Sequence, residues 1–348
     1  MSVAILVGLA SCSSDGAPAA DSNTVGSDAV TTNSTSPDTS SVPGTAAPDT
    51  AAPDTAAAGP TTTADGAAQP DLPESVQLTD EPGTTFESLD ASPDGSTIAF
   101  ENEHGVGLLS VESGDISYVV ENDDTTTATK PTYLGDGRLA LLIAEPGEVG
   151  GTINIIDDAG APQPLDLPVT VVDIEGATDD TIVYVSLTDE ARGIGSVQAD
   201  AASPAPQTIT GGLNDHDPTV TPGGTQLAFI RTDTDDAGNE VNTLITTDIA
   251  GGVEVPIIAS PRNGVLRAPS WSPDGGRLIV TMTATGSDGV DVEQLFVIDP
   301  ALGEIQATDG EGDKPEAVWI SDGEIAYRIV TDDQRNGQIF RVAAPAAG

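Results

Sequence analysis

Histidine and cysteine, which often serve in metal binding or nucleophilic catalysis, are scarce in this chain, which has two histidines and one cysteine. His216 stands between carboxylates in the segment Asn214-Asp215-His216-Asp217-Pro218. One imidazole and two carboxylates form a donor set that suits a divalent metal. The structural alternative is a solvated histidine that pairs with its acidic neighbours. Asp215, His216 and Asp217 are therefore candidate metal ligands. A solvated histidine without metal remains the alternative interpretation.

A second oxygen-rich segment runs Asp233-Thr234-Asp235-Asp236-Ala237-Gly238-Asn239-Glu240. Its carboxylates and amides are as dense as those of calcium-binding loops, whose ligands are oxygens. The spacing departs from the EF-hand at the fifth ligand position, and no flanking helices are predicted. A solvated hairpin loop explains the same residues. Asp233 and Asp235 are thus candidate ligands for calcium or another divalent cation; apart from this alternative, we expect no cofactor.

Motifs of other catalytic classes are absent from the sequence. It contains no Gly-x-Ser-x-Gly nucleophile elbow, no P-loop and no dinucleotide fingerprint. Glycoside hydrolysis needs a pair of carboxylates, and the sequence gives no basis for choosing such a pair among its 56 acidic residues. The sequence therefore nominates no catalytic residue.

The single cysteine, Cys12, ends a short apolar segment. The motif Leu9-Ala10-Ser11-Cys12 resembles a bacterial lipobox, in which the cysteine is diacylated and becomes the mature N-terminus. The apolar run is too short to span a membrane, whereas acyl chains add roughly 0.8 kcal/mol of membrane affinity per buried methylene. Residues 1–12 lack the basic n-region of an export signal, and the alternative is an incidental thiol. We expect residues 1–12 to be a signal peptide with lipobox, and the protein to be exported and held to the outer side of the cell membrane only by lipid.

A recurrent turn indicates the elements that must position any site. Its best copies are Ser92-Pro93-Asp94-Gly95 and Ser272-Pro273-Asp274-Gly275, and a degenerate copy is Thr178-Asp179-Asp180-Thr181. Proline and glycine preset the backbone angles of a turn between adjacent antiparallel strands. The turn glycines are Gly95, Gly137, Gly224, Gly275 and Gly323. The period is roughly 42–51 residues, which is typical of propeller blades.

Each repeat holds four short β-type runs bounded by turn residues, and no segment keeps a helical period for three turns. Four strands per repeat, arranged radially, predict an all-β, six-bladed β-propeller over residues 76–348. The position four residues before the turn glycine carries Tyr133, Val220, Trp271 and Trp319. We expect these side chains to pack between neighbouring blades.

The sixth repeat ends before its fourth strand. Upstream of the first turn, the segment Val76-Gln77-Leu78-Thr79-Asp80 resembles Ile305-Gln306-Ala307-Thr308-Asp309, the fourth strand of repeat five. We therefore predict that residues 76–79 complete blade six by pairing with residues 339–342. Such a strand closes the ring and protects its edges.

The repeat resembles a known family. The pattern Pro-x-aromatic-Ser-Pro-Asp-Gly of 269–275, followed by apolar strands such as Leu295-Phe296-Val297-Ile298-Asp299, is similar to the TolB-type (WD40-like) propeller repeat. The resemblance covers roughly residues 76–348 and is clearest in blades one, four and five, whereas blade three lacks the turn proline and glycine. Such repeats occur in translocation accessory proteins, in gating propellers of peptidases and in surface lipoproteins. Because they share no catalytic residues, the resemblance implies a fold and little about activity.

Residues 13–75 are mainly Ala, Thr, Ser, Pro, Asp and Gly, with a tandem Ala-Ala-Pro-Asp-Thr at 46–50 and 51–55. The segment has no aromatic residue, lysine, arginine or histidine. It cannot bury enough apolar surface to offset chain entropy. We therefore expect a disordered linker that acts as a stalk between anchor and propeller.

The formal net charge is −45, from 56 acidic and 11 basic residues. An acidic surface repels phosphates, so we exclude nucleic-acid binding. We expect a monomeric, non-enzymatic platform that binds another envelope protein or a wall polymer. The alternatives are a metal-assisted propeller enzyme of the lactonase or lyase type and an accessory or sensor subunit of an envelope complex. An enzyme should show polar side chains from several blades converging at one channel mouth, and a binding module should show an exposed apolar patch.

Overall fold

The computed structural model describes residues 72–347 except 179, 188–191, 201–203, 212–213, 262–263, 286–288 and 331–336. The predicted signal segment 1–12, its Cys12 and all but the end of the predicted linker 13–75 lie outside the described residues. All regular elements of the described part are β-strands, and this part holds no helix long and apolar enough to cross a membrane.

The described strands form six four-stranded antiparallel sheets. Blade one holds β2 (Glu87–Ala91), β3 (Thr97–Asn102), β4 (Gly105–Ser110) and β5 (Ile116–Glu121). Blade two holds β6 (Thr127–Tyr133), β7 (Leu139–Ala144), β8 (Thr152–Ile156) and β9 (Pro162–Leu165). Blade three holds β10 (Thr170–Gly176), β11 (Thr181–Leu187), β12 (Arg192–Gln198) and β13 (Gln207–Thr208).

The second half of the ring repeats this order. Blade four holds β14 (Asp215–Val220), β15 (Gln226–Thr234), β16 (Glu240–Asp248) and β17 (Val255–Ala259). Blade five holds β18 (Leu266–Trp271), β19 (Leu278–Thr285), β20 (Asp291–Asp299) and β21 (Gly303–Gln306). Blade six holds β22 (Ala317–Ser321), β23 (Glu324–Val330), β24 (Gly337–Ala343) and β1 (Val76–Gln77).

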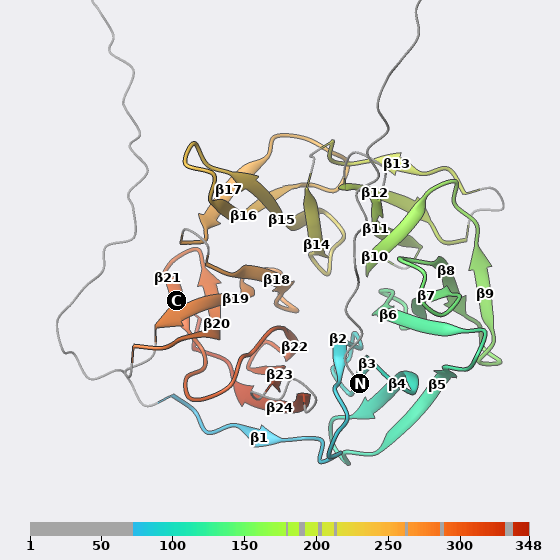
Figure 1. Cartoon of the computed structure of the whole chain (residues 1–348), viewed down its shortest axis with the longest axis horizontal. Coiled ribbons are helices and arrows are strands. Elements are labelled where there is room, and N and C mark those ends of the chain that lie inside the picture. The colour runs from blue at the N-terminus through green and yellow to red at the C-terminus, as the bar shows by residue number, and fades with distance from the viewer. Residues whose placement is uncertain are drawn as a thin grey trace, which may run out of the picture. The chain divides into compact units, whose positions relative to one another are not determined.

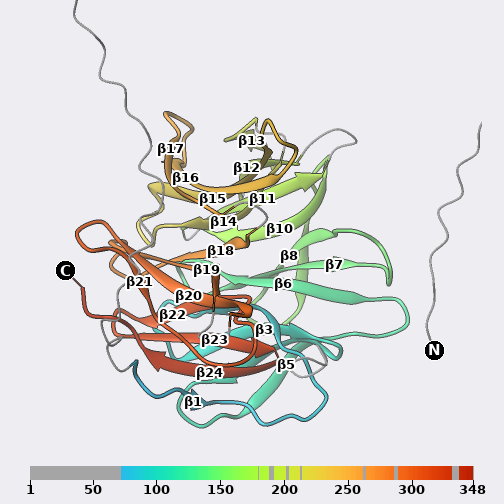
Figure 2. The ribbon, with the colours of Figure 1, turned by 60° about the vertical axis from the view of Figure 1, so that its left-hand side comes forward.

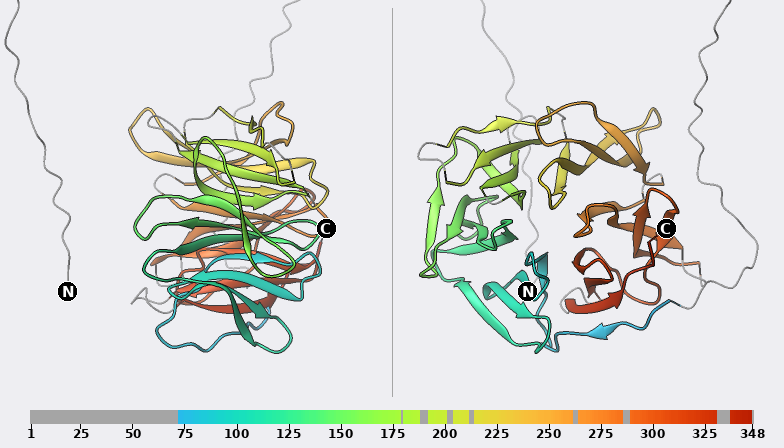
Figure 3. Two further views of the ribbon diagram at one scale, coloured as in Figure 1. Left: turned by 90° about the vertical axis from the view of Figure 1, so that its right-hand side faces the viewer. Right: turned by 180° about the vertical axis from the view of Figure 1, so that it is seen from behind.

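The blades are arranged radially, so that the first strand of each lies next to the centre of the ring and the fourth lies at its periphery (Figure 1). The oblique view of Figure 2 and the side and back views of Figure 3 show the same blades arranged around one axis. The predicted all-β, six-bladed propeller is confirmed.

Hydrophobic packing between blades forms the core. The described residues contain six buried clusters, and each one joins side chains of two adjacent blades. Tyr133, Val220, Trp271 and Trp319 each lie in the cluster that joins their own blade to the preceding one. In blade three the residue equivalent by strand pairing is Gly176, which lies opposite Ile182 as Trp271 lies opposite Leu278. A Cβ at Gly176 would lie 1.9 Å from the Tyr133 carbonyl oxygen. The backbone of blade two thus occupies the space that an aromatic ring takes elsewhere.

The N-terminal strand closes the ring as predicted. In β1, Val76 pairs with Arg341 and Gln77 with Phe340 of β24. The strand is shorter than the predicted 76–79, but the Leu78 N–H still donates to the Ile339 carbonyl at 2.8 Å. Blade six therefore consists of strands from both ends of the propeller.

A side-chain clasp secures this closure and repeats a motif of blade five. The Thr79 hydroxyl donates to the Gln338 amide oxygen at 2.9 Å and accepts from the Ile339 N–H at 2.9 Å. In blade five, Thr308 makes the same two bonds, to Gln294 and from Leu295, at 2.9 and 3.0 Å. The resemblance between the two sequence segments therefore extends to their hydrogen bonds.

The clasp predicts that Thr79→Val weakens the closure. The change leaves the buried Gln338 oxygen and Ile339 N–H without this partner, which should lower the free energy of unfolding by about 1–3 kcal/mol. Hydrogen exchange should also accelerate at the amides of β24, because its edge is freed. Thr308→Val removes the equivalent bonds from a blade that is continuous in sequence and should leave β24 exchange unchanged. Equal exchange in β24 for Thr79→Val and the native chain would contradict this role.

Candidate functional site

The first strands of the six blades surround a central cavity of about 320 Å³. Its wall is mostly polar, and charged side chains come from all six blades. The ten charged lining residues are Glu87, Asp90, Glu101, Lys130, Asp173, Glu175, Asp217, Arg267, Glu316 and Arg328.

A shared irregularity of the inner strands places these side chains. The pairing of the first strand with the second shifts register in every blade. In four blades the shift contains a non-glycine residue with positive φ, at 48–52°: Ser88, Lys130, Asp217 and Ala268. A residue in this left-handed conformation carries a strain of roughly 1–2 kcal/mol. In these four blades the unpaired residues line the cavity, so the bulge directs one position of each of these repeats to the centre. In blades three and six the shift falls at Val172 and Ile320, which do not line the cavity.

Lys130 is the positive centre of one side of the cavity. Its ammonium lies 3.5 Å from Asp173 Oδ1, and its backbone N–H donates to Glu101 Oε2 at 2.5 Å. Asp173 makes the largest contribution to raising the pKa of Lys130, and burial opposes it. Burial is also the main reason that the pKa values of Glu101, Asp173 and Glu316 are raised. These carboxylates pay a desolvation penalty that one lysine offsets only in part.

Asp90 and Glu175 link adjacent blades. Asp90 Oδ2 accepts from the Tyr133 N–H at 2.6 Å and from the Thr132 hydroxyl at 3.0 Å, both in blade two. Glu175 Oε1 likewise accepts from the next blade, from Thr219 and from the Val220 N–H, at 3.2 and 3.4 Å. Burial raises the pKa of Asp90 to about 6. Burial first, and then the nearby charge of Asp90, raise the pKa of Glu175 well above its usual value.

The two arginines of the cavity are paired as well. Arg267 pairs with Glu293 of β20. Arg328 Nη1 lies 2.8 Å from Glu87 Oε1, and its Nε lies 3.1 Å from Glu316 Oε1. The Arg328–Glu87 pair joins blade six to blade one, whereas the Arg267–Glu293 pair lies within blade five.

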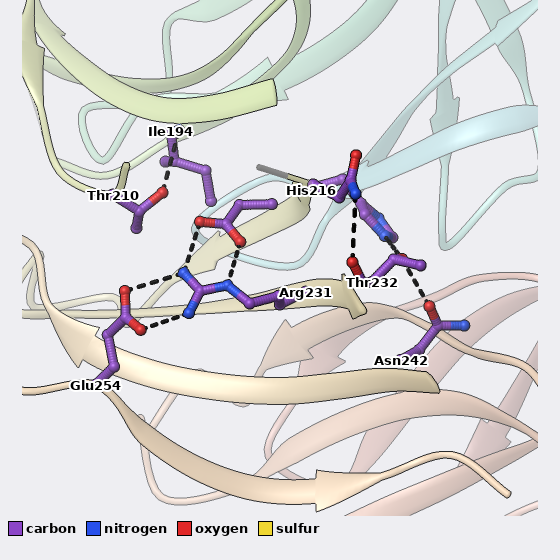
Figure 4. Close-up of polar contacts among 9 residues, drawn as sticks. Ile194, Thr210, His216, Arg231, Thr232, Asn242 and Glu254 are labelled. Carbon is purple, nitrogen blue, oxygen red and sulfur yellow. Dashed lines mark hydrogen bonds and ion pairs between the residues drawn. The ribbon is translucent and has the colours of Figure 1, made fainter. Parts of the chain in front are cut away.

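The first predicted metal ligand, Asp215, is engaged by an arginine. Its fully buried carboxylate receives two bonds from Arg231, at 2.7 and 2.9 Å. Glu254 holds the other side of the same guanidinium at 2.6 and 3.0 Å (Figure 4). This two-sided pairing uses the oxygens of Asp215 that a cation would need.

His216 and Asp217 are in direct contact. His216 Nδ1 lies 3.1 Å from Asp217 Oδ1. His216 Nε2 lies 3.0 Å from the Thr232 hydroxyl, and both residues are drawn in Figure 4. The Thr232 hydroxyl donates onward to Asn242 Oδ1 at 2.7 Å. Burial alone would raise the pKa of Asp217, but the His216 imidazole and the Ala268 N–H lower it to about 2. Of the predicted ligands, Asp217 lines the cavity.

The other two predicted ligands, Asp233 and Asp235, lie at the hairpin between β15 and β16. Asp235 Oδ1 accepts from the backbone N–H groups of Ala237 and Asn239, at 2.8 and 2.9 Å. Its carboxylate thus shapes the turn. Within the described residues, no group of three or more His, Cys, Asp or Glu side chains is arranged to hold a metal ion.

The sequence analysis missed most of the cavity wall, although the repeat carried a signal for it. Three residues before the inter-blade packing position, the six repeats place Ser88, Lys130, Asp173, Asp217, Ala268 and Glu316. Prolines follow this position directly in three blades, as Pro131, Pro218 and Pro269. Proline lacks an N–H and is tolerated where a strand bulges. Alignment of the repeats around these prolines would have found the ring.

The raised pKa of Asp90 predicts how stability depends on pH. A folded pKa of about 6, above the ordinary aspartate value of 3.8, means that the folded state holds this proton more tightly than the unfolded state does. The contribution to stability is therefore present below about pH 4 and is lost as pH rises through 6. Asp90→Asn should flatten the change of unfolding free energy between pH 5 and 7 by about 1–3 kcal/mol, since one pKa unit corresponds to about 1.4 kcal/mol.

Denaturant unfolding across this pH range tests the expectation. Asp94→Asn is the control, because hydrogen bonds from Ser96 lower the pKa of the exposed Asp94 carboxyl to about 2. Its contribution changes only below about pH 4, so the slope between pH 5 and 7 should match that of the native chain. If the unfolding free energy of Asp90→Asn changed with pH as steeply as that of the native chain, the proposed role of this carboxyl would be wrong.

Comparisons with known proteins place the fold and leave the activity open. A scan against protein-family models finds no match, and a search of curated proteins finds none either. The calcium-binding protein regucalcin from Agrobacterium tumefaciens is 14% identical with a TM-score of 0.55, over 79% of this chain and 96% of that one. A gluconolactonase from Xanthomonas campestris is 13% identical with a TM-score of 0.54, over 77% and 89%. A TolB-type protein from Agrobacterium tumefaciens is 14% identical with a TM-score of 0.50, over 68% and 97%. Because identities this low show the fold alone, the chain has a TolB-type six-bladed propeller fold.

Proposed function

We propose that this chain is a non-enzymatic lipoprotein of the cell envelope whose propeller binds another envelope protein or a wall polymer. One observation supports binding over catalysis. Each of the ten charged side chains that line the central cavity is engaged by a neighbouring group of the ring itself. The charges of the cavity therefore act to join blades, and substrate binding there would have to break those contacts.

The outer surface supports the same proposal. Apolar residues are exposed on and next to β17, the outer strand of blade four, where Val255 and Ile257 are 49% and 41% exposed. Contiguous exposed apolar surface is typical of interaction sites.

The second candidate is a metal-assisted enzyme, and the raised pKa values of the buried carboxyls Glu101, Asp173 and Glu316 favour it. Perturbed carboxyls in a cavity are typical of catalytic sites. Regucalcin, which is calcium-binding, and the gluconolactonase have similar folds. We rank this candidate second because inter-blade contacts account for the same carboxyls.

Divalent cations distinguish the two functions. The full chain should show no saturable change in melting temperature with calcium, magnesium or zinc, and no cation-dependent hydrolysis of lactones. A cation that binds the folded state at 100 times its Kd would stabilise it by about 2.7 kcal/mol, which is readily measured. Saturable stabilisation that Asp217→Asn abolishes, together with cation-dependent turnover, would favour the enzyme.

The proposed anchor is tested at Cys12. When the full chain is expressed in a bacterium with lipoprotein processing, it should partition into the detergent phase and carry a diacylated N-terminal cysteine by mass spectrometry. Cys12→Ser should shift it to the aqueous phase, because the acyl chains supply the membrane affinity. Ser14→Ala is the control and should partition like the native chain. An aqueous, unmodified native chain would refute the anchor.

A further inference from the structure

An apolar strip lies at the periphery of blade four. Val253, Val255 and Ile257 are 82%, 49% and 41% exposed, and they alternate along the chain at the start of β17. By contrast, Ile258 packs against the cluster between blades four and five. The three exposed side chains therefore contribute nothing comparable to the propeller core, and their exposure is unfavourable unless a partner covers them.

The backbone of β17 limits how a partner can bind. Among the described strands, β17 pairs with β16 alone and forms the outer edge of its sheet. Pro256 lacks an N–H, and the pairing shifts register between Leu244 and Ile245. Proline and bulges protect edge strands against indiscriminate pairing. A partner must therefore be recognised mainly by contacts to the side chains of the strip.

The charge of the surface restricts the chemistry of that partner. Each basic side chain that the structure describes is held by carboxylates or carbonyl oxygens of the propeller itself. These residues are Lys130, Arg138, Arg231, Arg267, Arg277, Lys314, Arg328 and Arg341. Next to the strip, the exposed Asp248 lies beside Gly252, where a Cβ would come within 3.4 Å of the carboxylate. Asp248 thus offers a negative charge beside the strip, whereas Glu254, between Val253 and Val255, is paired with Arg231.

The charge of the chain favours a basic partner over a second copy as the ligand of the apolar strip. A second copy would bring like charges together, since the chain carries a net charge of −45. We propose that the strip of Val253, Val255 and Ile257 binds an extended segment of a partner protein in which aliphatic residues alternate with lysine or arginine. The aliphatic side chains cover the strip, and the basic side chains face Asp248 and the acidic surroundings. This inference rests on the proposed binding function and assigns it a surface and a partner chemistry.

A peptide of alternating lysine and valine, labelled with a fluorophore, is the probe. It should bind the full native chain saturably by fluorescence anisotropy, and an alternating glutamate–valine peptide of equal length should not. Raising the ionic strength from about 0.05 to about 0.5 M should weaken binding, because salt screens exposed charges. Equal binding of both peptides, or no binding of either, would overturn the inference.

The double variant Val255→Thr, Ile257→Thr keeps β-branched side chains on the strand and makes the strip polar. It should bind the lysine–valine peptide at least about tenfold more weakly, which corresponds to about 1.4 kcal/mol. Val149→Thr alters a 72% exposed valine between β7 and β8 and is the matched control, with native affinity expected. Unchanged melting temperatures verify that both variants are folded. Native affinity in the double variant would overturn the assignment.

Photo-crosslinking of the full chain in cells separates this inference from the proposed function. Loss of a specific envelope-protein crosslink in the double variant alone supports both. If that crosslink persists in the double variant, the strip assignment is wrong and the binding function stands. If the native chain instead shows cation-dependent turnover and no crosslink, the proposed function fails.

Discussion

Closure of the ring by β1 and β24 is the constraint on which the rest of this propeller depends. Each blade buries one face against its neighbour, so an open ring would leave two apolar faces in water. The pairing of Val76 with Arg341 brings the two ends of the domain into one sheet. The Thr79–Gln338 clasp then fixes the register through buried hydrogen bonds, which are costly to leave unmade. The inner strands can form a fixed cavity wall because this ring is closed.

The cavity illustrates how a propeller uses charge to join its blades. Buried carboxylates accept N–H and hydroxyl bonds from the next blade, as Asp90 does from Tyr133 and Thr132. Burial opposes their ionisation, and the pKa of Asp90 rises to about 6 for that reason. The carboxylates that join adjacent blades therefore make the stability of the ring sensitive to pH. A cluster of perturbed carboxyls in a cavity can be structural, and its hydrogen-bond partners decide between that reading and catalysis.

The interior and the surface differ in charge balance. Inside, basic side chains are matched with acceptors, and Lys314 is an extreme case: its buried ammonium donates to the carbonyls of Gly310, Glu311 and Gly312 at 2.8–3.0 Å. Over the whole chain, acidic residues outnumber basic ones by 56 to 11, and every described basic side chain already has acceptors within the propeller. This imbalance disfavours self-association and selects for cationic partners, which is why the apolar strip on β17 is interpreted as a site for a basic, aliphatic segment.

The architecture could be predicted from the amino-acid sequence, because the turn Ser92-Pro93-Asp94-Gly95 and its copies encode local geometry at a regular spacing. The sequence also identified the closing strand, since Val76–Asp80 repeats the pattern of 305–309. The composition of the cavity wall and the partners of Asp215 and His216 became visible only in the folded ring. Arg231 and Thr232 are distant from them in sequence and meet them through the pairing of β14 with β15, and Glu254 then pairs with Arg231. Turn and strand preferences depend on neighbouring residues and can be predicted from a short stretch of sequence. Charge pairs depend on which strands the closed ring brings together.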